Sequence, residues 1–503
     1  MVTSYPELKD VLSPVHLPGH DRPHCLENTR VSIRKEIDDW IQNTTSPNVF
    51  LLLGAAGTGK STISTTIAEE YRGNGSLGCH LFFLRDKSDP TTVIRTIAYN
   101  LAVYNQNIAG CIEDALKDKG ELTSATLDSQ FNTFLFTPLH QSHVKSNPIL
   151  IVLDALDECG TRDTRRALMT LLGDKLSTLP KNYRFLITGR PEEDISSLSE
   201  SSNIRTVQLN SGIDDVRLFI DTELYKMKDV KRVSEFDDLK RKLGEAAGGL
   251  FIWASTAIRM IQQSSGRRAS KFKELARGGP LLLDDLYTVA LRNTLDWSDE
   301  TKELFSDIMG LILFGKEQMT DLKIDGILGV EEGTTSDILS CLRSLIIYDS
   351  GKPIRLHHTS FFDYLISSST KNEAWHIDET ESKRNIAEQC FIGMGRMLHF
   401  NMCRLESSYV ANRDVADLEE RVQKYTPPFL QYVCCHWSNH LLDIPYSGGM
   451  QGALRAFAYN HLLFWLEVMS VTNTLDTHGG SILTHAISWI GVRLPNYPPT
   501  YFN

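Results

Sequence analysis

Short hydrophobic runs alternate with longer amphipathic stretches between residues 26 and 210. Five runs rich in β-branched and aromatic residues predict strands at Val49–Leu53, Cys79–Leu84, Ile149–Leu153, Tyr183–Thr188 and Ile204–Leu209. The spacers between them carry apolar residues at helical spacing, as in Pro90–Tyr104. Alternation of this kind predicts a parallel sheet covered by helices.

An amphipathic helix is predicted ahead of the first strand. Residues 1–25 are rich in Pro, His and Gly and are expected to be a lead-in without a core of its own. Within Thr29–Gln42, the isoleucines at 33, 37 and 41 follow each other at intervals of four, and Trp40 lies on the same face. The helix should end before Asn43–Pro47, which is rich in turn residues.

After residue 210 the pattern becomes mostly helical. Helices are predicted over Asp214–Lys226 and Phe236–Ile261, followed by a polar and basic linker at Gly266–Gly279. Two more helices are predicted at Asp285–Leu295 and Thr301–Leu313.

A mixed segment from Asp321 to Leu365 follows these helices. It combines a helix at Ser336–Leu345, a hairpin-like stretch at Leu345–His357 and another helix, an order typical of a winged-helix module. The remainder, to Asn503, is apolar-periodic and predicts a helical bundle. The expected domains are a lead-in (1–25), an α/β core (26–210), a helical lid and linker (211–280), a winged-helix-like module (281–370) and a helical region (371–503) that is either a sensor or the stub of one.

Length and charge narrow the class of protein. A chain of 503 residues is too long for one compact core and suggests two to four domains. The 52 basic and 63 acidic residues give a net charge of −11, which argues against a constitutive nucleic-acid binder. No apolar run is long enough to span a membrane, and the N-terminus lacks the pattern of a secretory signal. Nine scattered cysteines favour a reduced, cytoplasmic chain.

A phosphate-binding motif follows the first predicted strand. Residues 54–61 fit G-x-x-x-x-G-K-[ST], with a hydrophobic strand before the motif and a helix, Ser61–Tyr71, after it. Glycines let successive backbone N–H groups point at phosphate oxygens, and the helix adds its positive end. Lys60 should reach the β and γ phosphates, and the Ser61 hydroxyl should coordinate Mg²⁺. The expected nucleotide contacts are Gly54, Ala55, Ala56, Gly57, Thr58, Gly59, Lys60, Ser61 and Thr62.

Carboxylates follow the third predicted strand. Asp154 comes directly after five apolar residues, at the carboxyl end of the strand, where open α/β sheets bind their ligands. Asp154 is therefore the candidate that organises Mg²⁺. Asp157 and Glu158 lie one short turn further, where a carboxylate orients or activates the attacking water.

An arginine follows the fourth predicted strand. Arg190 stands at the same edge of the sheet, where it could sense or neutralise the γ-phosphate. The alternative is that Arg190 caps a surface turn or pairs with Glu192.

Taken together, these motifs resemble those of the NACHT group of STAND NTPases, especially the large fungal forms. The resemblance rests on Gly54–Ser61, on Leu153–Cys159, where a small residue and two acids follow the first Asp, and on Thr188–Pro191. Gly249–Ala254 is similar to the helix of the family's lid. Leu356–Leu365 is similar to the end of its winged-helix module, which implies a nucleotide-sensing role for His358. The family's Gly-Leu-Pro-Leu is absent, so a proline contact to the base is not implied here.

The resemblance implies a signalling switch that binds ATP or GTP with Mg²⁺, hydrolyses it slowly and self-associates on activation, as in innate-immunity-like signalling. The triggering ligand, the protein partner and the preferred base stay open. Two other classes also stay open. One is a P-loop enzyme of the kinase or AAA-remodeller type, for which no acceptor-substrate motif is visible. The other is a nucleotide-stabilised interaction protein without hydrolysis.

Overall fold

The computed structural model describes residues 6–15, 23–85, 87–117, 126–142, 147–278, 282–292, 294–407, 409–475 and 479–491. Parts of the predicted lead-in, the last residue of the predicted linker (Gly279) and the C-terminal end lie outside these ranges. The chain divides into two compact units, residues 1–286 and 287–503, which are described separately. The division falls inside helix α15 (Leu283–Arg292). The five predicted domains are a finer division and stay a prediction.

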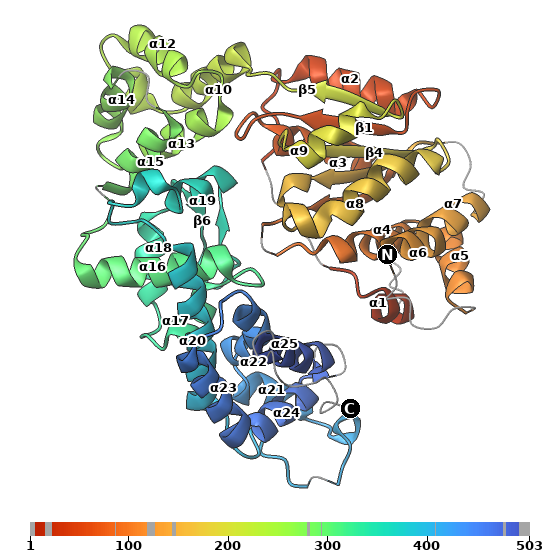
Figure 1. The fold of residues 1–503 in the computed structure, drawn as a ribbon. Coiled ribbons are helices and arrows are strands. Elements are labelled where there is room, and N and C mark those ends of the chain that lie inside the picture. The colour runs from red at the N-terminus through yellow and green to blue at the C-terminus, as the bar shows by residue number, and fades with distance from the viewer. Residues whose placement is uncertain are drawn as a thin grey trace. The chain divides into compact units, whose positions relative to one another are not determined.

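A five-stranded parallel sheet forms the centre of the first unit (Figure 1). All five strands lie where the hydrophobic runs predict them, and their order across the sheet is β2-β3-β4-β1-β5. Their bounds are Val49–Leu53 (β1), Leu77–Phe82 (β2), Ile149–Asp154 (β3), Tyr183–Gly189 (β4) and Ile204–Gln208 (β5). The fold class predicted for this region, a parallel sheet covered by helices, is confirmed.

Strand β4 lies between β1 and β3, so the phosphate-binding loop and Asp154 follow strands that are not neighbours. The register pairs Leu53 of β1 with Gly189 of β4, and Leu153 of β3 with Ile187. The carboxyl ends of the three strands therefore meet at one edge of the sheet, where the Gly54 N–H donates to the Gly189 carbonyl at 3.3 Å.

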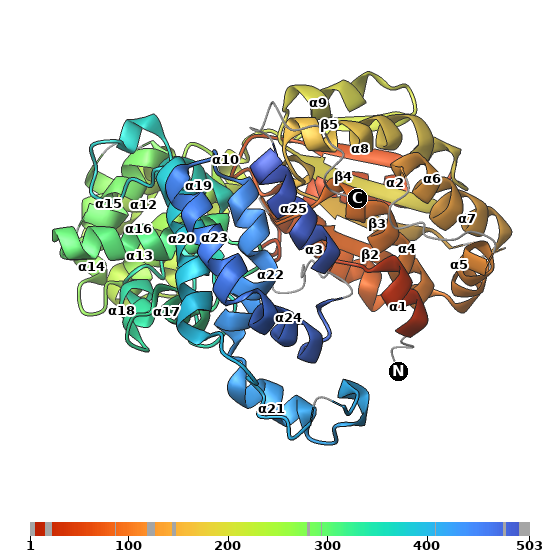
Figure 2. The same ribbon diagram turned by 60° about the horizontal axis from the view of Figure 1, so that its bottom comes forward.

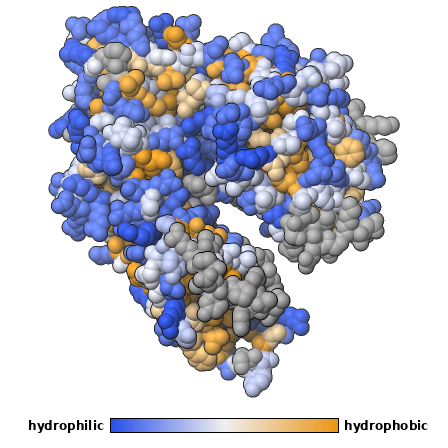
Figure 3. Space-filling model, in the orientation of Figure 1, coloured by the Kyte–Doolittle hydropathy of each residue, from blue (hydrophilic) through white to orange (hydrophobic). Residues whose placement is uncertain are grey.

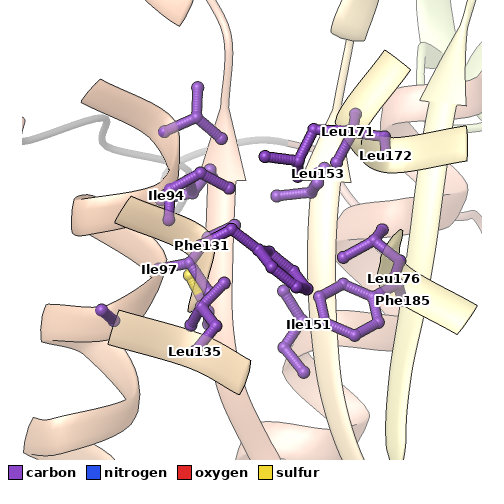
Figure 4. Close-up of a cluster of buried hydrophobic side chains, with 14 of the residues drawn as sticks. Ile94, Ile97, Phe131, Leu135, Ile151, Leu153, Leu171, Leu172, Leu176 and Phe185 are labelled. Atoms are coloured by element: carbon purple, nitrogen blue, oxygen red, sulfur yellow. The ribbon is translucent and has the colours of Figure 1, made fainter. Parts of the chain in front are cut away.

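Alternate residues of each strand enter two separate cores. One face of the sheet, including Ile151, Leu153 and Phe185, packs against α4 (Val93–Tyr104) and α8 (Arg162–Lys175) (Figure 4). The other face packs against α2 (Val31–Gln42) and α3 (Lys60–Gly73), two helices that lie beside the strands in Figure 2. These helices contribute buried side chains such as Trp40 and Ile67. Each fully buried aliphatic side chain contributes about 1.5–3 kcal/mol, and burial on both faces explains the continuous apolar runs.

Short helices complete the first core. The predicted lead-in contains a helix, α1 (Pro6–Leu12), whose Leu8 and Leu12 are buried in this core and not in a core of their own. The remaining elements are α1 (Pro6–Leu12), η1 (Pro90–Thr92), α5 (Gln106–Lys117), α6 (Leu127–Phe131), η2 (Asn132–Phe136), α7 (Thr137–Gln141), η3 (Leu156–Glu158), η4 (Leu176–Thr178), α9 (Glu193–Ser196) and η5 (Ser197–Glu200).

The helical segment after β5 differs from the prediction in two places. The single predicted helix Phe236–Ile261 is two helices, because Gly248 and Gly249 adopt φ values of 56° and 80° between them. The predicted basic linker contains a helix, α14, that buries Phe272 and Leu275. Only a few apolar residues lie on one face of this helix, and the residues between them are mostly polar or charged. The helices are α10 (Ile213–Tyr225), α11 (Lys228–Lys231), α12 (Phe236–Ala246), α13 (Phe251–Gln263) and α14 (Arg268–Arg277).

The second unit contains the expected order of helix, hairpin and helix. The predicted helix Ser336–Leu345 is shorter, and a further helix, α17, precedes it. Strands β6 and β7 pair antiparallel, as the hairpin-like stretch predicts. The elements are α16 (Asp299–Phe314), α17 (Asp321–Leu328), α18 (Thr334–Cys341), β6 (Ile346–Ile347), β7 (Arg355–Leu356), α19 (Thr359–Leu365) and η6 (Ser368–Thr370).

The described part of residues 371–491 is mostly helical, as predicted. Helix α22 packs against α20 and α25, and Trp437 and Trp465 are buried among these helices. The elements are α20 (Glu379–Met397), η7 (Asn412–Asp414), α21 (Leu418–Tyr425), α22 (Pro428–Leu442), α23 (Gly448–Asn460), α24 (Leu462–Val471) and α25 (Gly480–Gly491). Among the described residues, every helix is too short or too polar to cross a bilayer. In Figure 3 hydrophilic residues cover most of the visible face.

Candidate functional site

The loop between β1 and α3 has the backbone geometry of an anion site. Gly57 and Gly59 have φ values of 76° and 93°, which a side chain would make costly. Gly59 leads directly into α3, which begins at Lys60. The first N–H groups of a helix have no carbonyl partner within the helix and attract anions such as phosphate.

Lys60 lies folded against this loop. Its ammonium donates to the carbonyls of Gly54 at 2.7 Å and Ala55 at 3.0 Å, and only 9% of the residue is exposed. Burial lowers the pKa of Lys60, while the nearby carboxylates of Asp157 and Asp154 act in the opposite direction. The lysine therefore provides a positive charge inside the loop, next to the acidic residues that follow β3.

Asp154 is fully buried at the end of β3 and joins the helix to the neighbouring strand. Its Oδ1 accepts a hydrogen bond from Ser61 Oγ at 3.2 Å and another from the Thr188 hydroxyl of β4. Thr188 in turn accepts from the Ala155 N–H at 3.0 Å, which holds the turn after β3. Sequence reasoning gave Thr188 no role, although a hydroxyl at a strand end beside the site was the available signal.

The other carboxylate oxygen of Asp154 is buried, and no hydrogen-bond partner for it lies in the described part of the chain. A buried carboxylate oxygen is costly unless a cation or donor satisfies it. With the Ser61 hydroxyl beside it, this oxygen fits Mg²⁺, which binds through one or two protein oxygens and takes its other ligands from water and phosphates. No group of three or more His, Cys, Asp or Glu side chains suited to a metal occurs among the described residues. The residues present therefore fit a metal shared with a nucleotide.

Asp157 and Glu158 lie in the η3 turn, and both are buried. The Asp157 carboxylate is held by Arg190 through both oxygens: Oδ1 accepts from the Arg190 backbone N–H at 3.0 Å, and Oδ2 lies 3.1 Å from Arg190 Nε. Arg190 thus pairs with Asp157.

Glu192, which the sequence left open as a partner of Arg190, pairs with Arg165 of α8, a residue that sequence reasoning missed. Arg165 is 2% exposed, donates to the Asp157 carbonyl at 2.7 Å, and also pairs with Asp194. It therefore holds the η3 turn and the segment after β4 together. In the sequence, Arg165 stands beside Arg162 and Arg166, which are exposed, and nothing in the pattern distinguishes it from them.

The N-terminus of α13 lies on the phosphate-binding loop within the first unit. The Ile252 N–H donates to the Gly57 carbonyl at 3.3 Å, and a Cβ at Gly57 would lie 2.0 Å from Ile252 Cγ2. A Cβ at Gly59 would lie 3.7 Å from the Phe251 ring. The segment predicted as the lid helix, Gly249–Ala254, is thus in direct contact with the loop.

The remaining predicted residues fall into two groups. Ala55, Ala56, Thr58 and Thr62 lie in the loop or the first turn of α3 with the other predicted contacts. His358 belongs to the second unit, where it caps α19: its Nδ1 accepts from the Ser360 N–H at 3.0 Å. The Ser360 hydroxyl is 2.8 Å from the Tyr287 hydroxyl. A neutral His358 therefore carries its proton on Nε2, and its role at a nucleotide stays a prediction.

The parallel sheet, the glycine loop, Lys60 and the carboxylate of Asp154 define a P-loop NTPase. Residues 30–190 match the sequence family described as "Nephrocystin 3, N-terminal". A comparison with curated proteins finds no significant match.

Several solved structures resemble the chain. A STAND protein with a tetratricopeptide repeat sensor from Pyrococcus horikoshii is 12% identical, covers 95% of this chain and 72% of its own, and has a TM-score of 0.45. Cdc6p from Pyrobaculum aerophilum is 15% identical over 76% of this chain and 98% of its own, with a TM-score of 0.33. The Walker-type ATPase of Pyrococcus abyssi is 15% identical over 69% and 99%, with a TM-score of 0.32. Likeness at this level assigns no function.

The site and the family match over residues 30–190 identify the core of this chain as that of a P-loop NTPase. The predicted P-loop NTPase core is confirmed, and the resemblance to the STAND class stays a prediction. The closer likeness to the large fungal NACHT forms stays a prediction.

Proposed function

We propose that this chain is a NACHT-type signalling switch and scaffold that binds ATP or GTP with Mg²⁺, hydrolyses it slowly and self-associates in one nucleotide state. The observation that carries the proposal is the hydrogen bond from Ile252 in the lid helix to Gly57 in the phosphate-binding loop. Because the lid touches the loop itself, a change in the loop's contents changes what the lid packs against. A switch needs such a contact between lid and loop, whereas a protein that is only stabilised by its nucleotide does not.

Each predicted site residue has a place in this proposal. The loop from Gly54 to Thr62 binds the phosphates, and Lys60 turns from the loop carbonyls to the β and γ phosphates when they arrive. Ser61 and Asp154 hold Mg²⁺, which neutralises charge on the phosphates. Glu158 orients and deprotonates the attacking water, and His358 senses the nucleotide.

Slow hydrolysis is supported by the pairing of Asp157 with Arg190. Both oxygens of Asp157 accept from Arg190, so Asp157 does not act as the base while the pair persists. Arg190 likewise reaches a γ-phosphate only after it leaves Asp157. If the Asp157–Arg190 pair must separate before each turnover, hydrolysis is slow, which suits a signalling switch better than an efficient enzyme.

The switch requires that the two states differ in affinity for the diphosphate and the triphosphate. Moving an equilibrium from 1:99 to 99:1 takes roughly 5.5 kcal/mol of differential affinity. Contacts of the lid with the loop, made in one state and absent in the other, are the proposed source of that difference.

The test is the size of the purified chain with ADP and with a non-hydrolysable ATP analogue, measured by light scattering after gel filtration. The proposal expects a monomer with ADP and larger species with the analogue. A monomer in both states that turns over steadily would support a P-loop enzyme instead. A monomer that binds nucleotide without hydrolysing it would support an interaction protein.

A further inference from the structure

Arg30 stands at a junction of four chain segments in the first unit. It lies just before α2, is 8% exposed, and adopts a left-handed backbone conformation with φ 54° and ψ 26°. A non-glycine residue in this region costs on the order of 1 kcal/mol, so the surrounding contacts must hold it there.

The guanidinium of Arg30 bridges two stretches of backbone, of which the one at Thr58 is buried. Its Nη2 donates to the Thr58 carbonyl in the phosphate-binding loop at 2.8 Å, and its Nη1 donates to the Asn210 carbonyl after β5 at 3.1 Å. Gly212 allows this approach, since a Cβ there would lie 2.9 Å from Arg30 Cζ. A planar fork with fixed donors suits a bridge of this kind better than a lysine.

The same guanidinium also contacts the lid. Its Cζ lies 5.3 Å from the centre of the Phe251 ring of α13, and its Nε lies 3.7 Å from the Asp215 carboxylate of α10. Phe251 packs edge-on against Phe219 of α10, with ring centres 6.0 Å apart. One side chain thus contacts the phosphate-binding loop, the segment after β5 and two helices of the predicted lid, α10 and α13.

We propose that Arg30 is a positioning residue that transmits the state of the phosphate-binding loop to the lid through its bridge from Thr58 to Asn210 and its contact with Phe251. The proposal rests on the proposed function and names the coupling element within it. The phosphates order the loop through the backbone N–H groups, and the carbonyl of Thr58 is then fixed against Arg30. The guanidinium in turn fixes the ring of Phe251 and, next to it, the Ile252 N–H that reaches Gly57.

The test measures amide hydrogen exchange of α13 with and without ADP, together with the dissociation rate of a fluorescent ADP analogue. In the unaltered chain, ADP should slow exchange at α13. With Arg30→Ala, that effect of ADP should be lost, and dissociation should speed up roughly tenfold, as expected for the loss of charge-assisted hydrogen bonds. Arg30→Lys keeps the charge without the fork and should also lose the coupling.

Two further variants complete the design. Arg34→Ala, in the first turn of α2, removes an ion pair with Glu70 and should leave the coupling unchanged. Phe251→Leu removes the ring from the lid side and should reproduce the loss of coupling, so the test remains available if Arg30→Ala does not fold.

The possible results separate two failures. If α13 of the unaltered chain does not respond to ADP, both the switch and the role of Arg30 are wrong. If it responds equally in the unaltered chain, in Arg30→Lys and in Phe251→Leu, the switch stands and the role of Arg30 is wrong.

Discussion

Two buried aspartates, one in each unit, differ in how their carboxylates are satisfied. Asp154 of the first unit has an oxygen for which the described residues offer no hydrogen-bond partner. Asp321 of the second unit accepts from the N–H groups of Leu322 at 3.0 Å and Gly351 at 2.9 Å, and from the hydroxyls of Tyr348 and Ser350, both at 2.7 Å. Both aspartates are almost fully buried: Asp154 is 0% exposed and Asp321 is 2% exposed.

The difference indicates what each aspartate does. A carboxylate whose bonds are all made within the protein stabilises the fold, and here it ties the start of α17 to the turn between β6 and β7. A carboxylate that keeps a buried oxygen open costs stability, which supports the proposal that Asp154 binds a cation. Mutations that remove ligand binding without affecting folding, or the reverse, test this comparison.

The largest effect is expected for Lys60→Ala. Without the ammonium, nucleotide affinity should fall by roughly a thousandfold, or about 4 kcal/mol, while the circular dichroism spectrum stays unchanged. Isothermal calorimetry with ADP measures this. Lys175→Ala, which removes a surface ion pair with Asp128, is the matched control and should bind normally. Equal affinity in Lys60→Ala would refute the assignment of the site.

Glu158→Gln should separate binding from hydrolysis. The amide keeps the size of the side chain but cannot take a proton, so the hydrolysis rate should fall by about a hundredfold with ADP affinity retained. Single-turnover phosphate release measures the rate. An unchanged rate would transfer the role of the base to Asp157, which would then have to leave Arg190.

Asp154→Asn should affect the ligand and not the fold. Mg²⁺-dependent ATP affinity should fall by roughly thirtyfold, because a neutral amide is a weak ligand for a hard cation. The melting temperature without nucleotide should stay the same or rise, since a buried charge is removed. Titrations with ATP in magnesium and in EDTA, with a thermal scan of the apoprotein, measure both quantities. A large loss of apoprotein stability would show that Asp154 is mainly structural.

Asp321→Asn should show the reverse pattern. Replacing a carboxylate that accepts four hydrogen bonds by an amide should lower the free energy of unfolding by about 2–3 kcal/mol. Nucleotide affinity should not change. Chemical denaturation with and without ADP measures both, and a change in affinity at full folding would contradict the comparison.

The smallest effect is the pH dependence of the difference in unfolding free energy between the unaltered chain and Asp321→Asn. Burial acts to raise the pKa of Asp321, but hydrogen bonds from Ser350, Tyr348 and two backbone N–H groups outweigh it and hold the pKa below its ordinary value. A lowered pKa contributes stability above the pKa of the unfolded chain, about 3.9, and that stability is lost as the pH falls through the folded value. The stability gap between the unaltered chain and Asp321→Asn should therefore be constant above pH 5 and shrink below about pH 4. A gap that persists at pH 3 would contradict this assignment.

The sequence predicted some features of this protein correctly and missed others. The strands, the loop from Gly54 to Ser61 and the position of Asp154 at a strand end were all predicted. The helix break at Gly248 and Gly249 was not, because apolar residues continue at helical spacing across it. The helix α14 was also missed, since its three buried residues are dispersed among charged ones.

The sequence by itself determined the local elements and the phosphate-binding loop of this protein, because strands, helix periodicity and glycine turns depend on neighbouring residues. Only the tertiary structure decided that β4 lies between β1 and β3, which brings Thr188 to Asp154 and Arg190 to Asp157. Only it decided that Arg30 reaches Thr58, Asn210 and Phe251. These contacts join residues as far as 221 positions apart, Arg30 and Phe251, and depend on strand order and helix packing, which no local pattern encodes.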